Sequence, residues 1–154
     1  MREIFNKIIA KYLELRFKKI QRFQNYPFES QENIFNYLIN KGRDTSWGNE
    51  FGYNKIKSYK DFNNQVPVSV YDELKSRIDQ MMQGKRDVLW PGQVTMFSKS
   101  SGTNEDKSKF IPVAKENLEE CHIKGAWDAV SILYRLNPDS QLFAKKNLVM
   151  GGSV

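Results

Sequence analysis

The sequence predicts an α/β fold in which helices pack on a small mixed sheet, with a polar loop between strands. Two observations carry this prediction. Apolar residues recur at three- and four-residue intervals in the first half of the chain and again after residue 114, whereas near Val88 they form short extended runs. With 154 residues, 40% hydrophobic and 13% aromatic, the chain can build the core of one ordinary domain.

Residues 1–25 form a predicted basic amphipathic helix. They carry seven Lys/Arg and two Glu, a net +5 out of the total of +6, so the rest of the chain is nearly neutral. We expect this helix to dock on its own domain, although a basic helix of this kind could also bind an anionic membrane or nucleic acid. Its apolar stripe consists of Phe5, Ile8, Ile9, Tyr12, Leu13, Phe17, Ile20 and Phe23.

Further helices are predicted from capping residues. Pro27 should end the first helix, and Ser30 should cap a second that buries Ile34, Phe35, Leu38 and Ile39 before Lys41-Gly42 ends it. Residues 44–53 are rich in turn formers and predict a loop, followed by a short helix capped by Ser58. Ser69 should cap a longer helix that runs to Gln83, with Gly84 directly after it.

Strands are predicted at 88–90, 94–97 and 110–113, with Pro91-Gly92 as a turn between the first two. A long helix should then cover 118–136, and the apolar run 148–150 is a last strand candidate. Because this run is followed at once by Gly151-Gly152, we expect residues 1–154 to be the N-terminal portion of a larger domain. A single cysteine and no long apolar segment predict a cytoplasmic protein.

The loop between Phe97 and Pro112 has the residues needed to hold phosphates. Its hydroxyls and backbone amides can donate hydrogen bonds, Gly102 permits a tight turn, and its lysines supply positive charge. It lacks the spacing of the nucleoside triphosphatase P-loop, and its composition alone also fits a solvated turn. The candidate residues are Ser100, Ser101, Gly102, Thr103, Lys107 and Lys109.

In its wider context, Ser100-Ser-Gly-Thr103 followed by Lys107-x-Lys109-x-x-Pro112 resembles the phosphate-binding loop of the adenylate-forming superfamily. The form is that of the plant auxin-responsive acyl acid amido synthetases and their bacterial relatives, and the chain looks closer to the bacterial members. The resemblance also covers the approach to the loop, at Thr45-Ser-Trp-Gly48, Phe62-Asn-Asn-Gln-Val-Pro67, Tyr71-Asp-Glu-Leu74, Ile78, Gln83-Gly84, Leu89-Trp-Pro-Gly92 and Phe97.

The resemblance implies the N-terminal part of an adenylate-forming enzyme fold, with a phosphate-binding loop between strands. It implies that the full-length protein uses ATP and Mg²⁺ to convert a carboxylic acid into an acyl adenylate and then transfers the acyl group to an amino acid. Lys109 and then Lys107 would stabilise the leaving pyrophosphate as catalytic residues, and Ser100, Ser101, Gly102 and Thr103 would wrap the phosphates.

One departure from the family is Asn104-Glu105-Asp106, where many members have glycine, because two acids beside a triphosphate would repel it. The family's adenine and ribose motifs lie downstream of Val154, so we expect residues 1–154 alone to be inactive. Cys121 and His122 are neighbours on a helix and cannot converge on one ion, so no metal site is predicted. Two alternatives stay open: a binding module that uses the basic helix, and a structural remnant without activity.

Overall fold

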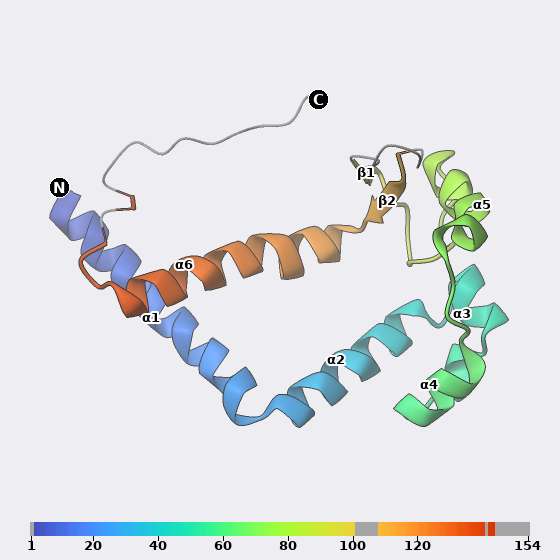
Figure 1. The fold of residues 1–154 in the computed structure, drawn as a ribbon, viewed down its shortest axis with the longest axis horizontal. Coiled ribbons are helices and arrows are strands. Elements are labelled where there is room, and N and C mark those ends of the chain that lie inside the picture. Colours follow the sequence, from blue (N-terminus) through green and yellow to red (C-terminus); the bar gives the residue numbers. More distant parts are fainter. Residues whose placement is uncertain (1, 101–107, 141, 144–154) are drawn as a thin grey trace. The chain divides into compact units, whose positions relative to one another are not determined.

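The computed structural model describes residues 2–100, 108–140 and 142–143, with side chains from residue 7 onward. The chain divides into two compact units, whose helices and strands are labelled in Figure 1. The first unit combines Met1–Pro27 with Glu120–Val154, and the second is Phe28–Glu119. None of the helices in the described ranges is both long and apolar enough to span a membrane.

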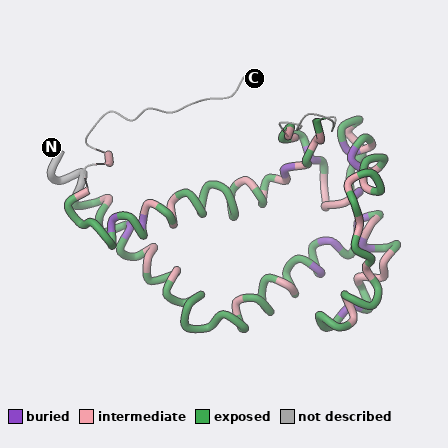
Figure 2. Tube along the Cα trace, in the orientation of Figure 1, coloured by how far each residue is buried: buried purple, intermediate pink, exposed green. Residues whose placement is uncertain are grey.

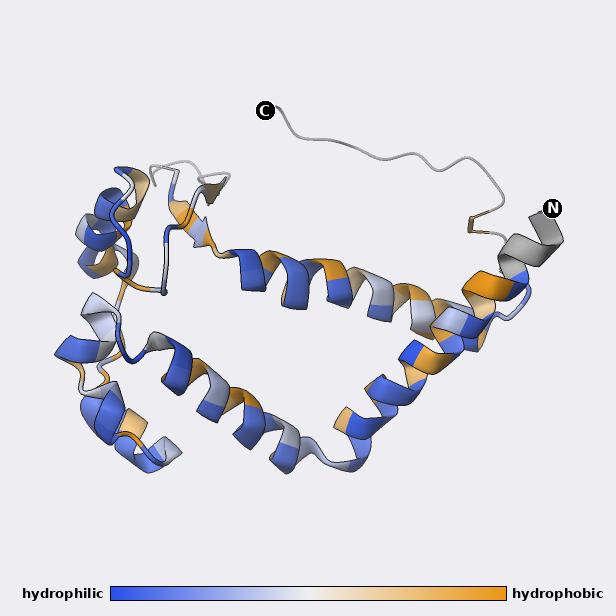
Figure 3. Ribbon diagram, turned by 180° about the vertical axis from the view of Figure 1, so that it is seen from behind, coloured by the Kyte–Doolittle hydropathy of each residue, from blue (hydrophilic) through white to orange (hydrophobic). Residues whose placement is uncertain are grey.

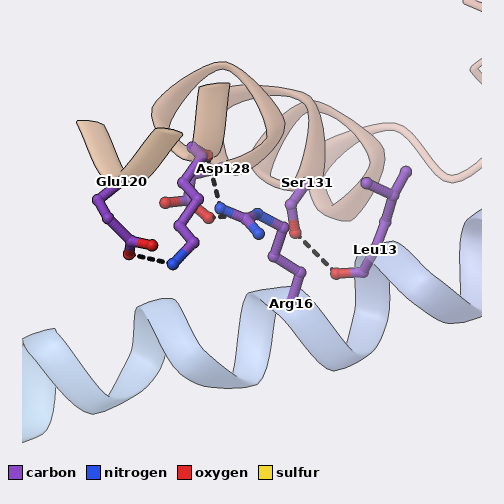
Figure 4. Close-up of polar contacts among 6 residues, drawn as sticks. Leu13, Arg16, Glu120, Asp128 and Ser131 are labelled. Atoms are coloured by element: carbon purple, nitrogen blue, oxygen red, sulfur yellow. Dashed lines mark hydrogen bonds and ion pairs between the residues drawn. The ribbon is translucent and has the colours of Figure 1, made fainter. Parts of the chain in front are cut away.

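The first unit is built on two helices, α1 (Arg2–Asn25) and α6 (Lys124–Leu136), that pack on each other. Leu13 is 1% exposed, and its carbonyl oxygen accepts a 2.7 Å hydrogen bond from the buried Ser131 hydroxyl (Figure 4). Nearby, Arg16 Nε lies 2.7 Å from Asp128 Oδ1, and the guanidinium also donates to the Lys124 carbonyl oxygen. The basic helix therefore packs on α6 within the first unit. Its docking on the rest of the predicted domain stays a prediction.

The predicted apolar stripe of α1 is only partly buried. Leu13 lies in the contact with α6 and Phe17 is half-buried, whereas Ile8 is 64% exposed and Phe23 56% exposed. Figure 2 shows the same alternation along α1, with most of the helix coloured as exposed. The helix is thus held at a few points near Leu13 and Arg16, where packing and polar contacts coincide.

Helix α2 (Pro27–Gly42) begins three residues before the predicted cap at Ser30, so that prediction is wrong. Proline suits the first position of a helix, because the amide hydrogen it lacks would have no intrahelical acceptor there. Ile39 is buried and Phe35 stacks on Tyr59 with ring centroids 4.5 Å apart. Ile34 and Leu38 remain exposed. Figure 3 shows orange, hydrophobic segments among the blue ones along α2.

The stretch predicted as a loop at 44–53 instead contains α3 (Ser46–Glu50) and the start of the 3-10 helix η1 (Tyr53–Lys55). Thr45 makes this helix possible. Its hydroxyl, in a residue 1% exposed, accepts from the Gly48 amide at 2.9 Å and donates to the Gly42 carbonyl at 2.6 Å. The threonine therefore caps α3 and ties it to the end of α2.

Two further helices lead to the sheet. In α4 (Tyr59–Gln65) the predicted cap is confirmed, because the Ser58 hydroxyl accepts from the Asp61 amide. In α5 (Tyr71–Met82) the cap is Val70 rather than Ser69, and the Glu73 carboxylate accepts from the Val70 amide at 3.0 Å. Here the carboxylate of Glu73, the third residue of the helix, accepts the hydrogen bond of the capping residue's backbone amide. This interaction does not require a hydroxyl at the capping position.

The predicted end of α5 is confirmed. Gly84 follows the helix with φ +89°, a backbone conformation that glycine adopts without strain. Its amide donates to the Met81 carbonyl at 2.9 Å, and the Lys85 amide donates to the Gln80 carbonyl at 3.0 Å. These two bonds form a Schellman motif, which satisfies the last carbonyl groups of the helix.

Residues 88–90 do not form the predicted strand, and the backbone carbonyls of Asp87 and Val88 bind helix α3 instead. The Val88 carbonyl accepts from the Trp47 amide at 3.0 Å, and the Asp87 carbonyl accepts from the Ser46 amide at 2.7 Å. Val88 packs with Met81 and Val94 in a small buried core. The segment therefore supports the first turn of α3 instead of pairing in a sheet.

The described sheet is an antiparallel hairpin of β1 (Met96–Lys99) and β2 (Phe110–Val113), in which Lys99 pairs with Phe110. The strand at 110–113 is confirmed, and the strand predicted at 94–97 begins at Met96. Helix α5 packs against β2. The long helix after β2 is also confirmed, with a π-helical start, η2 (Asn117–Ile123), before α6. The strand candidate at 148–150 lies outside the described residues.

A substitution at Gly48 tests how closely α3 approaches the end of α2. A Cβ at this position would lie 2.1 Å from the Gly42 carbonyl oxygen, which belongs to the backbone and cannot rotate away. We expect Gly48→Ala to lower the free energy of unfolding by about 1–3 kcal/mol, measured by urea denaturation.

The matched control is Gly125→Ala, because a Cβ on this exposed residue of α6 meets nothing within 4 Å. Alanine should stabilise that helix by about 0.5–1 kcal/mol. Equal effects of the two substitutions would contradict the close approach of α3 to the end of α2.

Candidate phosphate-binding loop

The candidate loop begins and ends at a pair of residues that bind each other. The Ser100 amide donates to the Lys109 carbonyl at 2.9 Å, and the Lys109 amide donates to the Ser100 hydroxyl oxygen, also at 2.9 Å. This pair extends the β1–β2 hairpin by one step beyond the Lys99–Phe110 pair. Ser100 and Lys109, which are nine positions apart, are therefore held next to each other.

Ser100 serves two purposes in this arrangement. Its oxygen accepts from the Lys109 backbone, and its O–H group can still donate to another acceptor. The ammonium of Lys109 contributes donors and a positive charge at the same end of the hairpin. The closure of the loop thus brings a hydroxyl donor and a cation together, a donor set that suits phosphate oxygens.

Tyr71, the first residue of α5, supports the Lys109 side of the loop. Its hydroxyl oxygen accepts from the Phe110 amide at 3.0 Å. Its ring lies beneath the Lys109 ammonium, with Nζ 5.5 Å from the ring centroid. No local pattern in the sequence points to this role of Tyr71, because the residue that its hydroxyl binds is 39 positions away. The only hint was its place in the family-like run Tyr71-Asp-Glu-Leu74.

The far end of β2 is held by Glu116. Its carboxylate accepts from the Trp90 indole at 3.2 Å and lies 3.5 Å from the Lys41 ammonium of α2. The backbone amide of Glu116 itself, the Trp90 indole and the Lys41 charge hold the pKa of this carboxyl below its usual range. Glu116 therefore stays ionised at neutral pH and ties the segment after β2 to α2 and to the segment before β1.

The predicted site residues fall into two groups. Ser100 and Lys109 are described and adjacent. Ser101, Gly102, Thr103 and Lys107 lie outside the described residues, as does Asn104-Glu105-Asp106. Cys121 and His122 are exposed in η2, and the described parts of the chain contain no group of three His, Cys, Asp or Glu placed to hold a metal ion.

Comparison with known proteins identifies the family. A model described as the GH3 family N-terminal domain matches residues 16–150. The chain belongs to the GH3 family. The resemblance to auxin-responsive acyl acid amido synthetases, inferred from the loop and its approach, is thereby confirmed.

Individual relatives agree with this assignment. The indole-3-acetic acid-amido synthetase GH3.4 of Arabidopsis thaliana is 28% identical over 109 residues, which are 70% of this chain and 18% of that protein. The jasmonoyl–L-amino acid synthetase JAR6 of Nicotiana attenuata is 25% identical over 120 residues, or 73% of this chain and 21% of that protein. The chain thus spans about a fifth of the length of the relatives it matches.

The fold agrees as well. The solved structure of a GH3.15 acyl acid amido synthetase superposes with a TM-score of 0.69 at 22% identity, over 77% of this chain and 21% of that one. The predicted fold class, the N-terminal part of this enzyme fold, is therefore confirmed, although the described sheet is antiparallel and not mixed as predicted.

The reciprocal bonds at the loop ends predict a local effect of Ser100→Ala. Without the hydroxyl, the half-buried Lys109 amide loses its acceptor, a loss of about 1 kcal/mol. We expect hydrogen exchange at that amide to become about fivefold faster, measured by NMR. Ser98→Ala, an exposed change two residues earlier in β1, should leave this amide unaffected, and the same acceleration in both variants would contradict the closure.

Proposed function

We propose that this chain is the phosphate-binding N-terminal portion of an ATP-dependent ligase that joins a carboxylic acid to an amino acid through an acyl adenylate. One observation carries the proposal: the Ser100–Lys109 closure sets a hydroxyl donor and an ammonium at the loop that the GH3 family match covers. The printed names of the relatives, indole-3-acetic acid-amido and jasmonoyl–L-amino acid synthetases, agree with this reaction class.

In the proposed reaction a carboxylate oxygen attacks the α-phosphorus of ATP. An acyl–phosphate bond forms, the bond to the bridging oxygen breaks, and pyrophosphate leaves with its electrons. The amine of the amino acid then attacks the acyl carbon, AMP leaves, and the amine loses a proton. Mg²⁺ supplies additional positive charge at the phosphates when it is bound.

The residues of this chain act on the phosphates. Lys109, and after it Lys107, neutralises the charge that develops on pyrophosphate, while Ser100, Ser101, Gly102 and Thr103 donate hydrogen bonds around the phosphates. In this proposal the adenine, ribose and acceptor contacts come from the rest of the full-length protein, which is cytoplasmic. Residues 1–154 alone are then inactive.

The main test of this proposal is Lys109→Ala in the full-length protein. Losing one charge-assisted contact to phosphate removes about 1.5–3 kcal/mol of transition-state stabilisation. We expect acyl-adenylate formation, measured as ATP–pyrophosphate exchange, to slow by roughly ten- to a hundredfold.

The control for this test is Lys75→Ala, which removes an exposed lysine from α5 and should leave the exchange rate unchanged. Two results would contradict the proposal. One is exchange that is insensitive to Lys109→Ala. The other is full exchange by residues 1–154 alone.

The docking of α1 also bears on the alternative of a membrane- or nucleic-acid-binding module. Arg16 forms an ion pair with Asp128, and Leu13 is buried where its carbonyl binds Ser131 of α6. Part of the basic helix is therefore used in contacts within the first unit. We therefore expect only weak, salt-sensitive binding to anionic vesicles or duplex DNA, measured by co-sedimentation. Submicromolar binding that survives high salt would instead support the module.

A further inference from the structure

Tyr71 of helix α5 contacts two groups at the Lys109 end of the loop, the backbone amide of Phe110 and the ammonium of Lys109. The hydroxyl oxygen holds the Phe110 backbone amide at 3.0 Å, and the ring face lies 5.5 Å from Lys109 Nζ. One side chain thus contacts the side chain of Lys109 and the backbone of the next residue.

We propose that Tyr71 is a positioning residue that holds the Lys109 ammonium in place for the transferred phosphates. This inference rests on the proposed function, in which Lys109 stabilises the leaving pyrophosphate. Neither the local sequence pattern nor the family match assigns this role to Tyr71, the first residue of α5.

The energetics of the two contacts suit this role. A lysine side chain has four rotatable bonds and loses much rotamer freedom when it is fixed. A tyrosine ring attracts an ammonium more weakly than a carboxylate would, because it carries no net charge. The ring can therefore restrict where the ammonium lies without neutralising its charge.

The backbone contact restricts Lys109 from the other side. Phe110 is the first residue of β2, and its amide is fixed to Tyr71 while the Lys109 amide is fixed to Ser100. The peptide groups on both sides of the Lys109 Cα are therefore held. The side chain starts from a defined position, and the ring needs to restrict only its far end.

Helix α5 can serve as a rigid support for Tyr71. Its first turn is closed by the Glu73 carboxylate on the Val70 amide, and its last turn by the Schellman motif at Gly84. Ile78 and Met81 bury its inner face. A side chain on the first residue of this helix is consequently held in place by groups that do not belong to the loop.

The test is a double-mutant cycle in the full-length protein, read by ATP–pyrophosphate exchange. Tyr71→Leu removes both contacts and should slow exchange about tenfold, whereas Tyr71→Phe keeps the ring and should slow it no more than about threefold. In a Lys109→Ala background, Tyr71→Leu should have no further effect, since Tyr71 acts through that lysine.

The matched control is Tyr59→Leu. Tyr59 is also the first residue of its helix, α4, and its ring stacks on Phe35 instead of contacting the loop. Tyr59→Leu should leave exchange unchanged, and thermal unfolding of every variant shows whether it is folded.

A second measurement on residues 1–154 tests the contact without any activity. In NMR spectra with labelled lysine, assigned with Lys109→Arg, the ε-methylene protons of Lys109 should be shifted upfield by the ring. The shift should persist in Tyr71→Phe and disappear in Tyr71→Leu. An unshifted wild-type signal, or one that Tyr71→Leu leaves unchanged, would overturn the inference.

The outcomes separate the inference from the proposed function. If Lys109→Ala slows exchange while Tyr71→Leu does not, or if Tyr71→Leu acts equally in both backgrounds, the positioning role is wrong and the proposed function stands. If Lys109→Ala has no effect, the proposed function fails, and the positioning role fails with it even where the NMR contact is present.

Discussion

The candidate phosphate-binding loop depends on a hairpin that could not persist alone. A two-stranded antiparallel sheet in water is marginal at best, because it has too little apolar surface to bury. In this chain β1 and β2 have four residues each, so their register must be fixed from outside. Tyr71 does this where β2 begins, and Glu116, bound to Trp90 and Lys41, does it just after β2 ends. The position of Ser100 and Lys109 follows from these supports.

These supports depend in turn on the contacts that hold α3 against the end of α2. Thr45 ties the first turn of α3 to the end of α2, and Gly48 lets the two backbones approach closely. The amides that open this helix then bind the carbonyls of Asp87 and Val88, the segment that leads into β1. A chain of backbone contacts thus runs from α2 through α3 to the hairpin. Small residues and a buried hydroxyl are needed along it, because larger side chains would separate the segments.

The sequence predicted those features that are encoded locally. Ser58 before α4, Gly84 after α5 and the strand Phe110–Val113 follow from one residue type or one short pattern, and the structure has all three. The errors occur where contacts with residues distant in the sequence determine the local structure. Residues 88–90 have the composition of a strand, but the carbonyls of Asp87 and Val88 bind the amides of Ser46 and Trp47, which come much earlier in the chain.

The same distinction applies to the candidate site. Ser100 and Lys109 could be found from the sequence because the loop motif contains both residues. Tyr71 could not be found, because its role comes from a hydrogen bond and a ring contact that only the fold creates. The α3 helix was missed for a related reason: Gly48 and Asn49 favour turns, and the cap that overrides this preference is a threonine bonded to a carbonyl of another helix.

Net charge is a poor guide to where the candidate anion-binding residues lie in this chain. Most of the excess of +6 lies in α1, yet there Lys11 pairs with Glu14 and Arg16 with Asp128, so part of that charge stabilises the helix and its contact with α6. The nearly neutral remainder of the chain contains Lys109, whose ammonium lies over the ring of Tyr71 in α5. A phosphate site needs a few donors at fixed positions more than it needs a high average charge. In the proposed site, the described part of the hairpin supplies one lysine and one serine for this purpose, both held at fixed positions.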